Sequence, residues 1–249
     1  MTTLIRSAIL EHYTKPRPEY KGSGKISCSS FGRCMRSVMM DLAGVETPNY
    51  AGFPSHIREV MDYGTAYEDV SFKLLKEKYG SAITTQQRVG DAIWSGKLDF
   101  LIKLPGEQPI IGEHKSTGNK YFDYNLEFPK WEHVCQAWLY GQLYEAQFHV
   151  KPRVIIYYIA WTSWAEFELF DNSDSGHGYA LGEVDGATVR RPVALEILPA
   201  RRAAFEAAYK ALPAIPEIPC NSPCDAYGCL FRGEKSCRFF DICWPQNEG

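Results

Sequence analysis

The sequence of 249 residues lacks the features that would place it in a membrane or in a repeat architecture. No uninterrupted apolar run approaches the roughly 20 residues that span a bilayer. The N-terminus lacks the basic-then-apolar pattern of a secretory signal, and the chain has no internal repeat and no low-complexity tract. Hydrophobic residues make up 45% of the chain, which is ordinary for a globular protein with a real core. We therefore expect a cytoplasmic protein with no membrane contact.

The sequence also lacks the overall basic charge that marks many nucleic-acid-binding proteins, because its net charge is −3. The charge is unevenly placed, however. Residues 1–40 contain seven Lys and Arg against two Glu, a local balance of +5. A basic end on an acidic protein would suit a groove that holds phosphates locally. A solvated N-terminal surface explains the same charges equally well, so both interpretations stay open at this point.

Cysteine, by contrast, is abundant, with eight in the chain. Five fall within the last thirty residues, at Cys220, Cys224, Cys229, Cys237 and Cys243. Cys34 lies far upstream. Disulfides are typical of small secreted domains, whereas clustered thiols in a chain without a secretory signal indicate ligands of a metal or of an iron–sulfur cluster. Cys34 would then join the N-terminal segment to the tail. Four thiolates also suit Zn²⁺, so a zinc site is the alternative.

Hydrophobic periodicity and turn residues predict an α/β protein with one domain over residues 1–249. The apolar spacing predicts helices over 2–14, from Ser29 or Ser30 to Leu42, and over 55–79, 127–146 and 195–212. Short β-rich runs predict strands over 83–89, 92–104, 109–115, 154–161 and 164–170. Residues 172–186, rich in Gly, Asp and Ser, are expected to form a loop.

Two carboxylates and a lysine are expected to meet on the predicted hairpin of 92–104 and 109–115. Glu113 and Lys115 point to the same face of a strand because side chains alternate, and Asp99 can converge on them from the partner strand. Carboxylates are hard oxygen ligands that suit Mg²⁺ or Mn²⁺, helped by a backbone carbonyl such as that of His114. The metal would activate a water, and Lys115 would orient or deprotonate that water or stabilise the transition state.

A Glu-x-Lys pattern alone has little specificity, since the chain contains a second copy at Glu19-Tyr20-Lys21 in a proline-rich stretch. The copy at Glu113 differs by its apolar approach and by Asp99, although an exposed ion pair on an edge strand remains the alternative.

Two further groups of residues are candidates for the same site. Gln136 and Tyr140, four residues apart, share one face of a predicted helix. Gln136 would hold a phosphate oxygen or a metal-bound water, and Tyr140 would contact the substrate backbone or stack on a base. The alternative is that Tyr140 is a core aromatic. Glu68, on the 55–79 helix, is either a further metal ligand or an ordinary surface carboxylate.

These elements, in this order, resemble the RecB-like branch of the PD-(D/E)XK nucleases. The resemblance is strongest to the iron–sulfur exonucleases of the Cas-four and AddB nuclease type, some of them phage-encoded, and it covers roughly residues 27–243. The matching stretches are Cys34-Met35-Arg36, Gly96-x-x-Asp99, Glu113-x-Lys115, Gln136-x-x-x-Tyr140 and the cysteine tail.

The resemblance implies a restriction-endonuclease-like core, a mixed central sheet flanked by helices. In such a core Asp99, Glu113, the His114 carbonyl and Glu68 would hold Mg²⁺ or Mn²⁺. Lys115 would be the catalytic lysine, while Gln136 and Tyr140 would position the substrate. The implied activity is that of a metal-dependent DNA exonuclease acting on single-stranded ends. The implied setting is a bacterial, archaeal or phage-infected cell, with a recombination, helicase or CRISPR-adaptation protein as partner.

The resemblance also implies a structural 4Fe-4S cluster, held in a clasp formed by residues 27–45 and 219–245. Its ligands would be Cys34, Cys229, Cys237 and Cys243. The interval Cys237-x5-Cys243 follows the family pattern, but the cysteine before Cys237 is eight positions away, so Cys224 is the alternative to Cys229. The remaining cysteines, Cys28, Cys135 and Cys220, are expected to be structural or incidental thiols.

A second departure from the family concerns metal binding. The family usually has a metal-binding histidine where this chain has Tyr67. Tyrosine is a poor ligand for Mg²⁺, so Glu68 would supply the carboxylate, or metal binding would be weakened. A cluster-bearing DNA-binding or adaptor protein with a weak or inactive site is therefore the alternative function.

Overall fold

The computed structural model describes residues 23–46, 55–117, 129–160, 162–171, 178–184, 186–215 and residue 239, with only the backbone described for residues 55–60. Its strands are β1 Ile26–Ser27, β2 Ile83–Gly90, β3 Trp94–Ile102, β4 Ile110–Ser116, β5 Arg153–Ile159, β6 Trp164–Phe170, β7 Gly178–Val184 and β8 Ala187–Val193. Its α-helices are α2 Met35–Leu42, α3 Ser55–Tyr79, α5 Trp131–Phe148 and α6 Leu198–Lys210. Short 3₁₀ turns are η1 Cys28–Ser30, η2 Gly80–Ala82 and η3 Leu195–Ile197.

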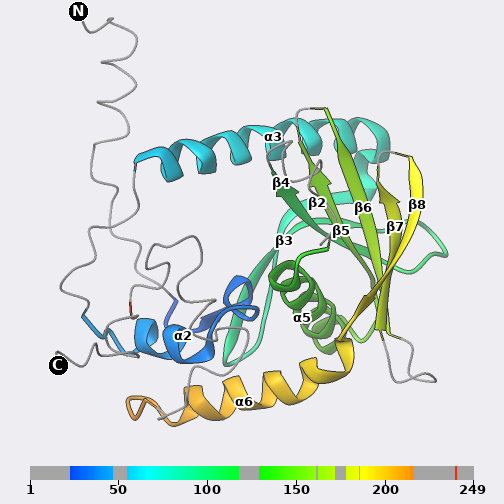
Figure 1. Cartoon of the computed structure of the whole chain (residues 1–249). Coiled ribbons are helices and arrows are strands. Elements are labelled where there is room, and N and C mark those ends of the chain that lie inside the picture. Colours follow the sequence, from blue (N-terminus) through cyan, green and yellow to red (C-terminus); the bar gives the residue numbers. More distant parts are fainter. Residues whose placement is uncertain are drawn as a thin grey trace, which may run out of the picture.

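All of these strands belong to one mixed sheet (Figure 1). The strand order is β1-β3-β4-β5-β6-β7-β8, with β2 pairing to β3. The pairs β1–β3 and β4–β5 are parallel, and the other pairs are antiparallel. Parallel neighbours need a long crossover, and α5 lies in the crossover from β4 to β5. The predicted α/β class, with a mixed sheet flanked by helices, is therefore confirmed.

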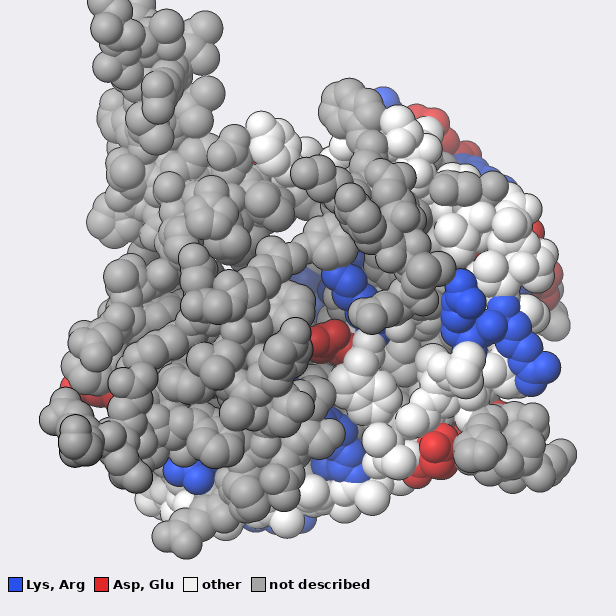
Figure 2. Space-filling view, in the orientation of Figure 1, with Lys and Arg blue, Asp and Glu red and all other residues white. Residues whose placement is uncertain are grey.

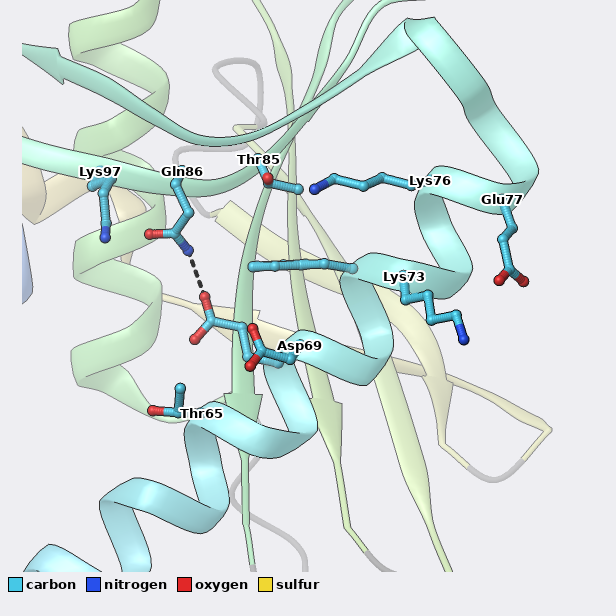
Figure 3. Close-up of a pocket in the computed structure, with 10 residues that line it drawn as sticks. Thr65, Asp69, Lys73, Lys76, Glu77, Thr85, Gln86 and Lys97 are labelled. Carbon is cyan, nitrogen blue, oxygen red and sulfur yellow. Dashed lines mark hydrogen bonds between the residues drawn. The ribbon is translucent and has the colours of Figure 1, made fainter.

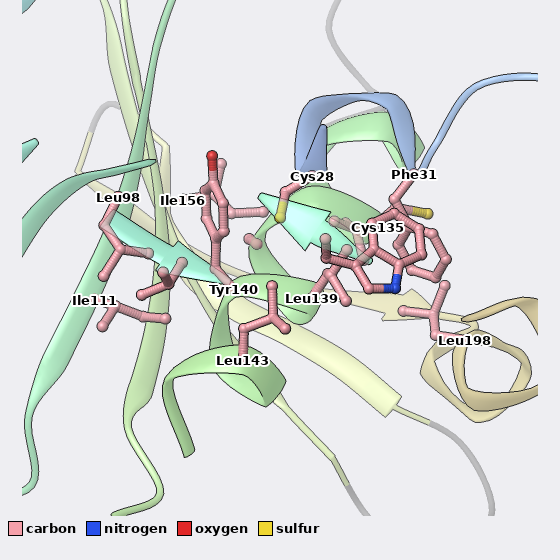
Figure 4. Packing of buried hydrophobic residues seen from close by; sticks show 14 of the residues in the cluster. Cys28, Phe31, Leu98, Ile111, Cys135, Leu139, Tyr140, Leu143, Ile156 and Leu198 are labelled. Atoms are coloured by element: carbon pink, nitrogen blue, oxygen red, sulfur yellow. The ribbon is translucent and has the colours of Figure 1, made fainter. Parts of the chain in front are cut away.

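Helices cover both faces of the sheet at β4, which the side-chain alternation of that strand explains. Ile111 belongs to the main core cluster with Val134 and Leu139 of α5. Its neighbour Ile110 packs instead against a smaller cluster that contains Phe72 of α3. Figure 4 shows part of the main cluster, including Ile111, Leu139 and Tyr140. Residues of β4 thus point alternately toward α5 and toward α3.

Gly112, in β4, is needed because its cross-strand partner Phe100 lies over it. A Cβ atom built on Gly112 would lie 1.8 Å from Phe100 Cζ. The ring is buried, with 6% of its surface exposed, and has little room to move away. We expect Gly112→Ala to lower the free energy of unfolding by about 1–3 kcal/mol, the usual cost of overpacking.

Chemical denaturation would measure that loss. The matched control is the double substitution Gly112→Ala with Phe100→Leu, which removes the ring that the new methyl group meets. If Gly112→Ala alone is as stable as the wild type, then the Phe100 ring does not exclude a side chain at position 112.

Two sequence predictions are corrected by the fold. Residues 172–186 are not a continuous loop, because 178–184 form β7, which pairs with both β6 and β8. The helix expected from Ser29 or Ser30 is shorter: η1 comes first, and α2 begins at Met35 with Cys34 at its N-cap. Gly32 lies between the two elements, packed against α5 so closely that a Cβ would lie 2.4 Å from Glu132 Cα.

The remaining predictions agree with the structure where it is described. The helix expected over 55–79 coincides with α3, and the strands over 83–89, 92–104, 109–115, 154–161 and 164–170 begin and end within two residues of the observed ones. The helix over 195–212 corresponds to η3 and α6. The expected helix over 2–14 lies outside the described residues, as does the first part of the helix expected over 127–146.

Candidate active site

The β3–β4 hairpin brings together Asp99, Glu113 and Lys115. The antiparallel register runs through Phe100 and Gly112. Just beyond that pair, the backbone N–H of His114 donates a hydrogen bond to Asp99 Oδ2 over 2.7 Å. Lys115 Nζ forms an ion pair with Glu113 Oε1. The hairpin and the shared face that the sequence predicted are both present.

Burial strongly perturbs these three groups. The pKa of Asp99 is raised to about 8, first by desolvation and then by the neighbouring Glu113 carboxylate. Burial also raises the pKa of Glu113, and the Lys115 ammonium offsets this only in part. For Lys115, burial is the largest single effect and lowers the pKa, but Glu113, Asp99 and Glu68 together outweigh it, so the pKa is raised. The lysine is therefore protonated at neutral pH.

One oxygen of Glu113 has no hydrogen-bond partner among the described residues. The Glu113 side chain is only 2% exposed, and its Oε2 atom is fully buried without a donor. A buried carboxylate oxygen that lacks a partner is costly. A divalent cation at this site would be coordinated by this oxygen together with the neighbouring Asp99 carboxylate.

Helix α5 extends the site through a chain of hydrogen bonds. Lys115 Nζ donates to Gln136 Oε1 over 3.4 Å, and Gln136 Nε2 donates to the Tyr140 hydroxyl over 3.0 Å. Tyr140 in turn donates to the backbone carbonyl of Lys97 in β3 over 3.1 Å. Gln136 and Tyr140 are thus tied to Lys115, and Tyr140 is also a core residue, 4% exposed.

Gly96 makes this arrangement possible. A Cβ atom on Gly96 would lie 2.4 Å from Tyr140 Cε1 and 2.7 Å from Cys28 Sγ. Only a residue without a side chain allows the tyrosine ring to approach β3 so closely. The Gly in Gly96-x-x-Asp99 therefore has a packing role next to the carboxylate.

The structure adds two residues that were not assigned to the site from the sequence. Lys115 and Tyr158 are register partners in β4 and β5. The Tyr158 hydroxyl lies 2.9 Å from His133 Nδ1 on α5. Burial lowers the pKa of His133 to about 3, helped by Lys115, so the imidazole is neutral. The spacing of three residues places His133 near the helix face of Gln136, so the sequence could have identified it as a site residue. The position of Tyr158 could not be identified in this way, because it depends on the register of β4 and β5.

His114 points to the other face of β4. Its Nε2 atom lies 3.0 Å from Ser71 Oγ of α3, and both side chains are buried. Burial lowers the pKa of His114 to about 4. The imidazole therefore links β4 to α3, and the proposed metal contact of His114 concerns only its backbone carbonyl.

Glu68 lies at the edge of the site on α3. Its Oε1 atom accepts a hydrogen bond of 2.5 Å from Gln86 Nε2. Burial raises the pKa of Glu68, while Lys97 and Lys115 lower it, which places both ammonium groups within electrostatic reach. Glu68 also lines a groove of about 810 Å³ between α3 and strands β2 and β3, and Figure 3 shows the residues around it.

Two of the predicted metal ligands are adjacent, but no larger set is. In the part of the chain that the structure describes, no group of three or more His, Cys, Asp or Glu side chains is placed to hold a metal ion. Asp99 and Glu113 are neighbours, and Glu68 is turned toward Gln86. On the face drawn in Figure 2, an acidic group lies in a recess between groups of Lys and Arg side chains.

Of the predicted cluster ligands, only Cys34 falls within the described residues. The tail cysteines Cys220, Cys224, Cys229, Cys237 and Cys243 lie outside them. Cys28 and Cys135 are buried in the main core, as expected of packing residues, and burial raises the pKa of both thiols.

Comparisons with known proteins do not assign the chain to a family. No protein-family model matches it, and no curated protein does. One solved structure that it is similar to is described as "Crystal structure of SSO0001", with 18% identity, a TM-score of 0.47, and coverage of 96% of this chain and 93% of that one. No helix among the described residues is both long and apolar enough to cross a membrane.

Proposed function

We propose that the protein is a metal-dependent DNA exonuclease of the RecB-like PD-(D/E)XK type, acting on single-stranded ends. The observation that carries the proposal is the buried, unpartnered Glu113 Oε2 beside Asp99 and Lys115. One buried carboxylate, Glu113, one partly buried carboxylate, Asp99, and a protonated lysine make an electrostatic arrangement that costs stability, which is typical of active sites. A surface ion pair, the alternative from sequence, would not be buried.

The donor set fits Mg²⁺ or Mn²⁺, since Asp99 and Glu113 offer hard carboxylate oxygens. Such an ion would supply Lewis-acid stabilisation of the charge that develops on a phosphate. The protonated Lys115 is poorly suited to remove a proton from water, and its ammonium would instead donate to the phosphate in the transition state. Gln136 fixes Lys115, and Tyr140 fixes Gln136, so α5 would hold the lysine in position for that step.

The sheet topology is compatible with the proposed restriction-endonuclease-like core. A restriction-endonuclease-like core needs a mixed sheet with its carboxylates on adjacent strands. The β3–β4 hairpin carries Asp99 and Glu113, and the α5 crossover follows directly. The recombination, helicase or CRISPR-adaptation partner is also part of the proposal, and it rests on the resemblance alone.

An assay on end-labelled single- and double-stranded DNA with Mg²⁺ or Mn²⁺ tests the function. We expect metal-dependent release of short products from single-stranded ends. Binding of DNA without hydrolysis under any of these conditions would instead support the alternative, an inactive DNA-binding or adaptor protein.

The proposal includes a structural 4Fe-4S cluster held by Cys34, Cys229, Cys237 and Cys243. Cys34 stands at the N-cap of α2. Arg201 of α6 donates to the carbonyl oxygens of Phe31 and Arg33, over 2.8 Å and 2.6 Å. The helix that precedes the cysteine tail in sequence is therefore hydrogen-bonded to the turn that precedes Cys34.

We expect Cys243→Ser to abolish the visible absorption and the acid-labile sulfide of anaerobically purified protein and to lower its stability, because binding energy at such a site contributes to folding. Cys220→Ser is the matched control and should change neither. Cys224→Ser and Cys229→Ser, compared side by side, identify the remaining ligand. Zinc without sulfide in the wild-type protein would contradict the cluster.

A further inference from the structure

The groove between α3 and strands β2 and β3 shares two lining residues with the surroundings of the candidate active site. Glu68 and Lys97 line it and also belong to the surroundings of the site. The backbone carbonyl of Lys97 accepts the hydrogen bond from Tyr140, and the charges of Lys97 and Lys115 both act on Glu68. The groove therefore lies beside the candidate site, with Glu68 under the influence of Lys97 and Lys115.

Three lysines line the groove, namely Lys73 and Lys76 on α3 and Lys97 on β3. All three are exposed. Three carboxylates line the same groove, yet none of these lysines forms an ion pair with any residue in the described part of the chain. Their ammonium groups can therefore take an anionic ligand without first breaking an internal pair.

We infer that this groove binds the sugar–phosphate backbone of the single strand next to the phosphate that is cleaved. The inference rests on the proposed function, and it adds the path of the substrate. From Thr65 to Lys76 the groove follows about 16 Å of α3. At the spacing of about 3.4 Å per nucleotide of a stacked strand, this is room for about four to five nucleotides.

The acidic residues of the groove should affect strand binding in the direction opposite to the lysines. Asp69 and Glu77 also line it. A strand that follows the lysines passes these carboxylates too, and like charges weaken binding. Removing a lysine should therefore weaken strand binding, while removing Asp69 or Glu77 should strengthen it. A ligand that avoids the groove would be insensitive to both changes.

The test uses fluorescence anisotropy of a labelled oligo-dT with the full-length Asp99→Asn protein, so that no strand is cut during the titration. For single strands, the logarithm of affinity falls with the logarithm of salt with a slope of about −0.7 for each phosphate contact. Lys73→Gln with Lys76→Gln should flatten this slope by about 1.4, which is a loss of about fivefold in affinity per lysine at 0.1 M salt.

Asp69→Asn with Glu77→Gln should tighten binding over the same salt range. The matched control is Lys151→Gln, an exposed lysine just before β5 and outside the groove. It should change affinity by much less than either lysine of the groove. Thermal melting of each variant would check that the fold is retained, which we expect because the substituted side chains are exposed.

The inference is overturned if the double lysine variant keeps the wild-type salt slope, or if Lys151→Gln flattens it equally. Because binding is measured without hydrolysis, the two proposals can fail separately. A protein that binds oligo-dT through these lysines but never cleaves DNA would overturn only the exonuclease. A protein that cleaves DNA but binds it independently of the groove lysines would overturn only the groove.

Discussion

Replacing Asp99 with Asn is expected to reduce the rate of metal-dependent DNA hydrolysis by about 10²–10⁴-fold, while leaving the fold intact. The substitution keeps the size of the side chain and removes the charge that would hold the cation beside Glu113. Lys115→Met should give a loss of similar size, because it removes the ammonium that donates in the transition state. Initial rates on end-labelled single-stranded DNA would measure both losses.

The matched control removes an ion pair that lies elsewhere on the sheet. Arg153 of β5 and Glu168 of β6 form a pair of 2.6 Å on a partly exposed surface. Glu168→Gln should leave the rate within about a factor of two, since such pairs contribute about 0–1 kcal/mol. Equal rates for Asp99→Asn and the wild type would show that the carboxylate pair is not the catalytic site.

Divalent metal is expected to stabilise the protein strongly at pH 8 and weakly at pH 5. Burial and the neighbouring Glu113 carboxylate raise the pKa of Asp99 to about 8 in the folded protein, from an ordinary value of 3.8. The folded state therefore binds more protons than the unfolded state between these values. Its stability from this group is complete below the unfolded pKa and is lost as pH rises through the folded one. Burial of Glu113 shifts its pKa in the same direction.

A cation that replaces the proton reverses this loss. At a concentration 100 times its dissociation constant, Mg²⁺ or Mn²⁺ adds about 2.7 kcal/mol, which corresponds to a rise of about 5–10 °C in Tm for a chain of this size. At pH 5 the cation must displace a proton from Asp99, so the rise should be much smaller. Thermal melts at both pH values, with EDTA or with metal, would measure the difference.

Asp99→Asn separates this effect from general pH effects. Without metal at pH 8, the variant should be more stable than the wild type, because it buries a neutral amide instead of a carboxylate. It should also lose most of the metal-induced rise in Tm. A variant that keeps the full rise would place the cation elsewhere in the molecule.

The half of the sheet that carries the site could be predicted from the sequence because its signals are local. The apolar pair Ile110-Ile111 begins the strand that carries Glu113, and the turn between β3 and β4 contains Pro105, Gly106 and Pro109. Side-chain alternation then places Glu113 and Lys115 on one face. Helical spacing does the same for Gln136 and Tyr140.

Other features depended on contacts between distant residues. Tyr158 lies opposite Lys115 only because of the parallel register of β4 and β5. Hydrophobic periodicity does not determine which residues of two distant strands are paired. Cys34 lies at the N-cap of α2, and the preceding Gly32 packs closely against Glu132 of α5, a contact between distant residues. In contrast, β7 and β8 carried a local signal, the Asp185-Gly186 dipeptide between them, which is typical of tight hairpins. The Gly, Asp and Ser content of the region obscured it.

The parallel pairing of β4 with β5 also determines when the site can form during folding. The strands β2, β3 and β4 follow one another closely, so Asp99, Glu113 and Lys115 can meet through local contacts. Ile110 pairs with Arg153, and closing a loop of about forty residues is slower than forming a hairpin. We therefore expect Gln136, Tyr140 and Tyr158 to join last. A nascent or partly unfolded chain would hold two clustered carboxylates with an unfixed lysine, and we expect it to acquire hydrolytic activity only when α5 docks.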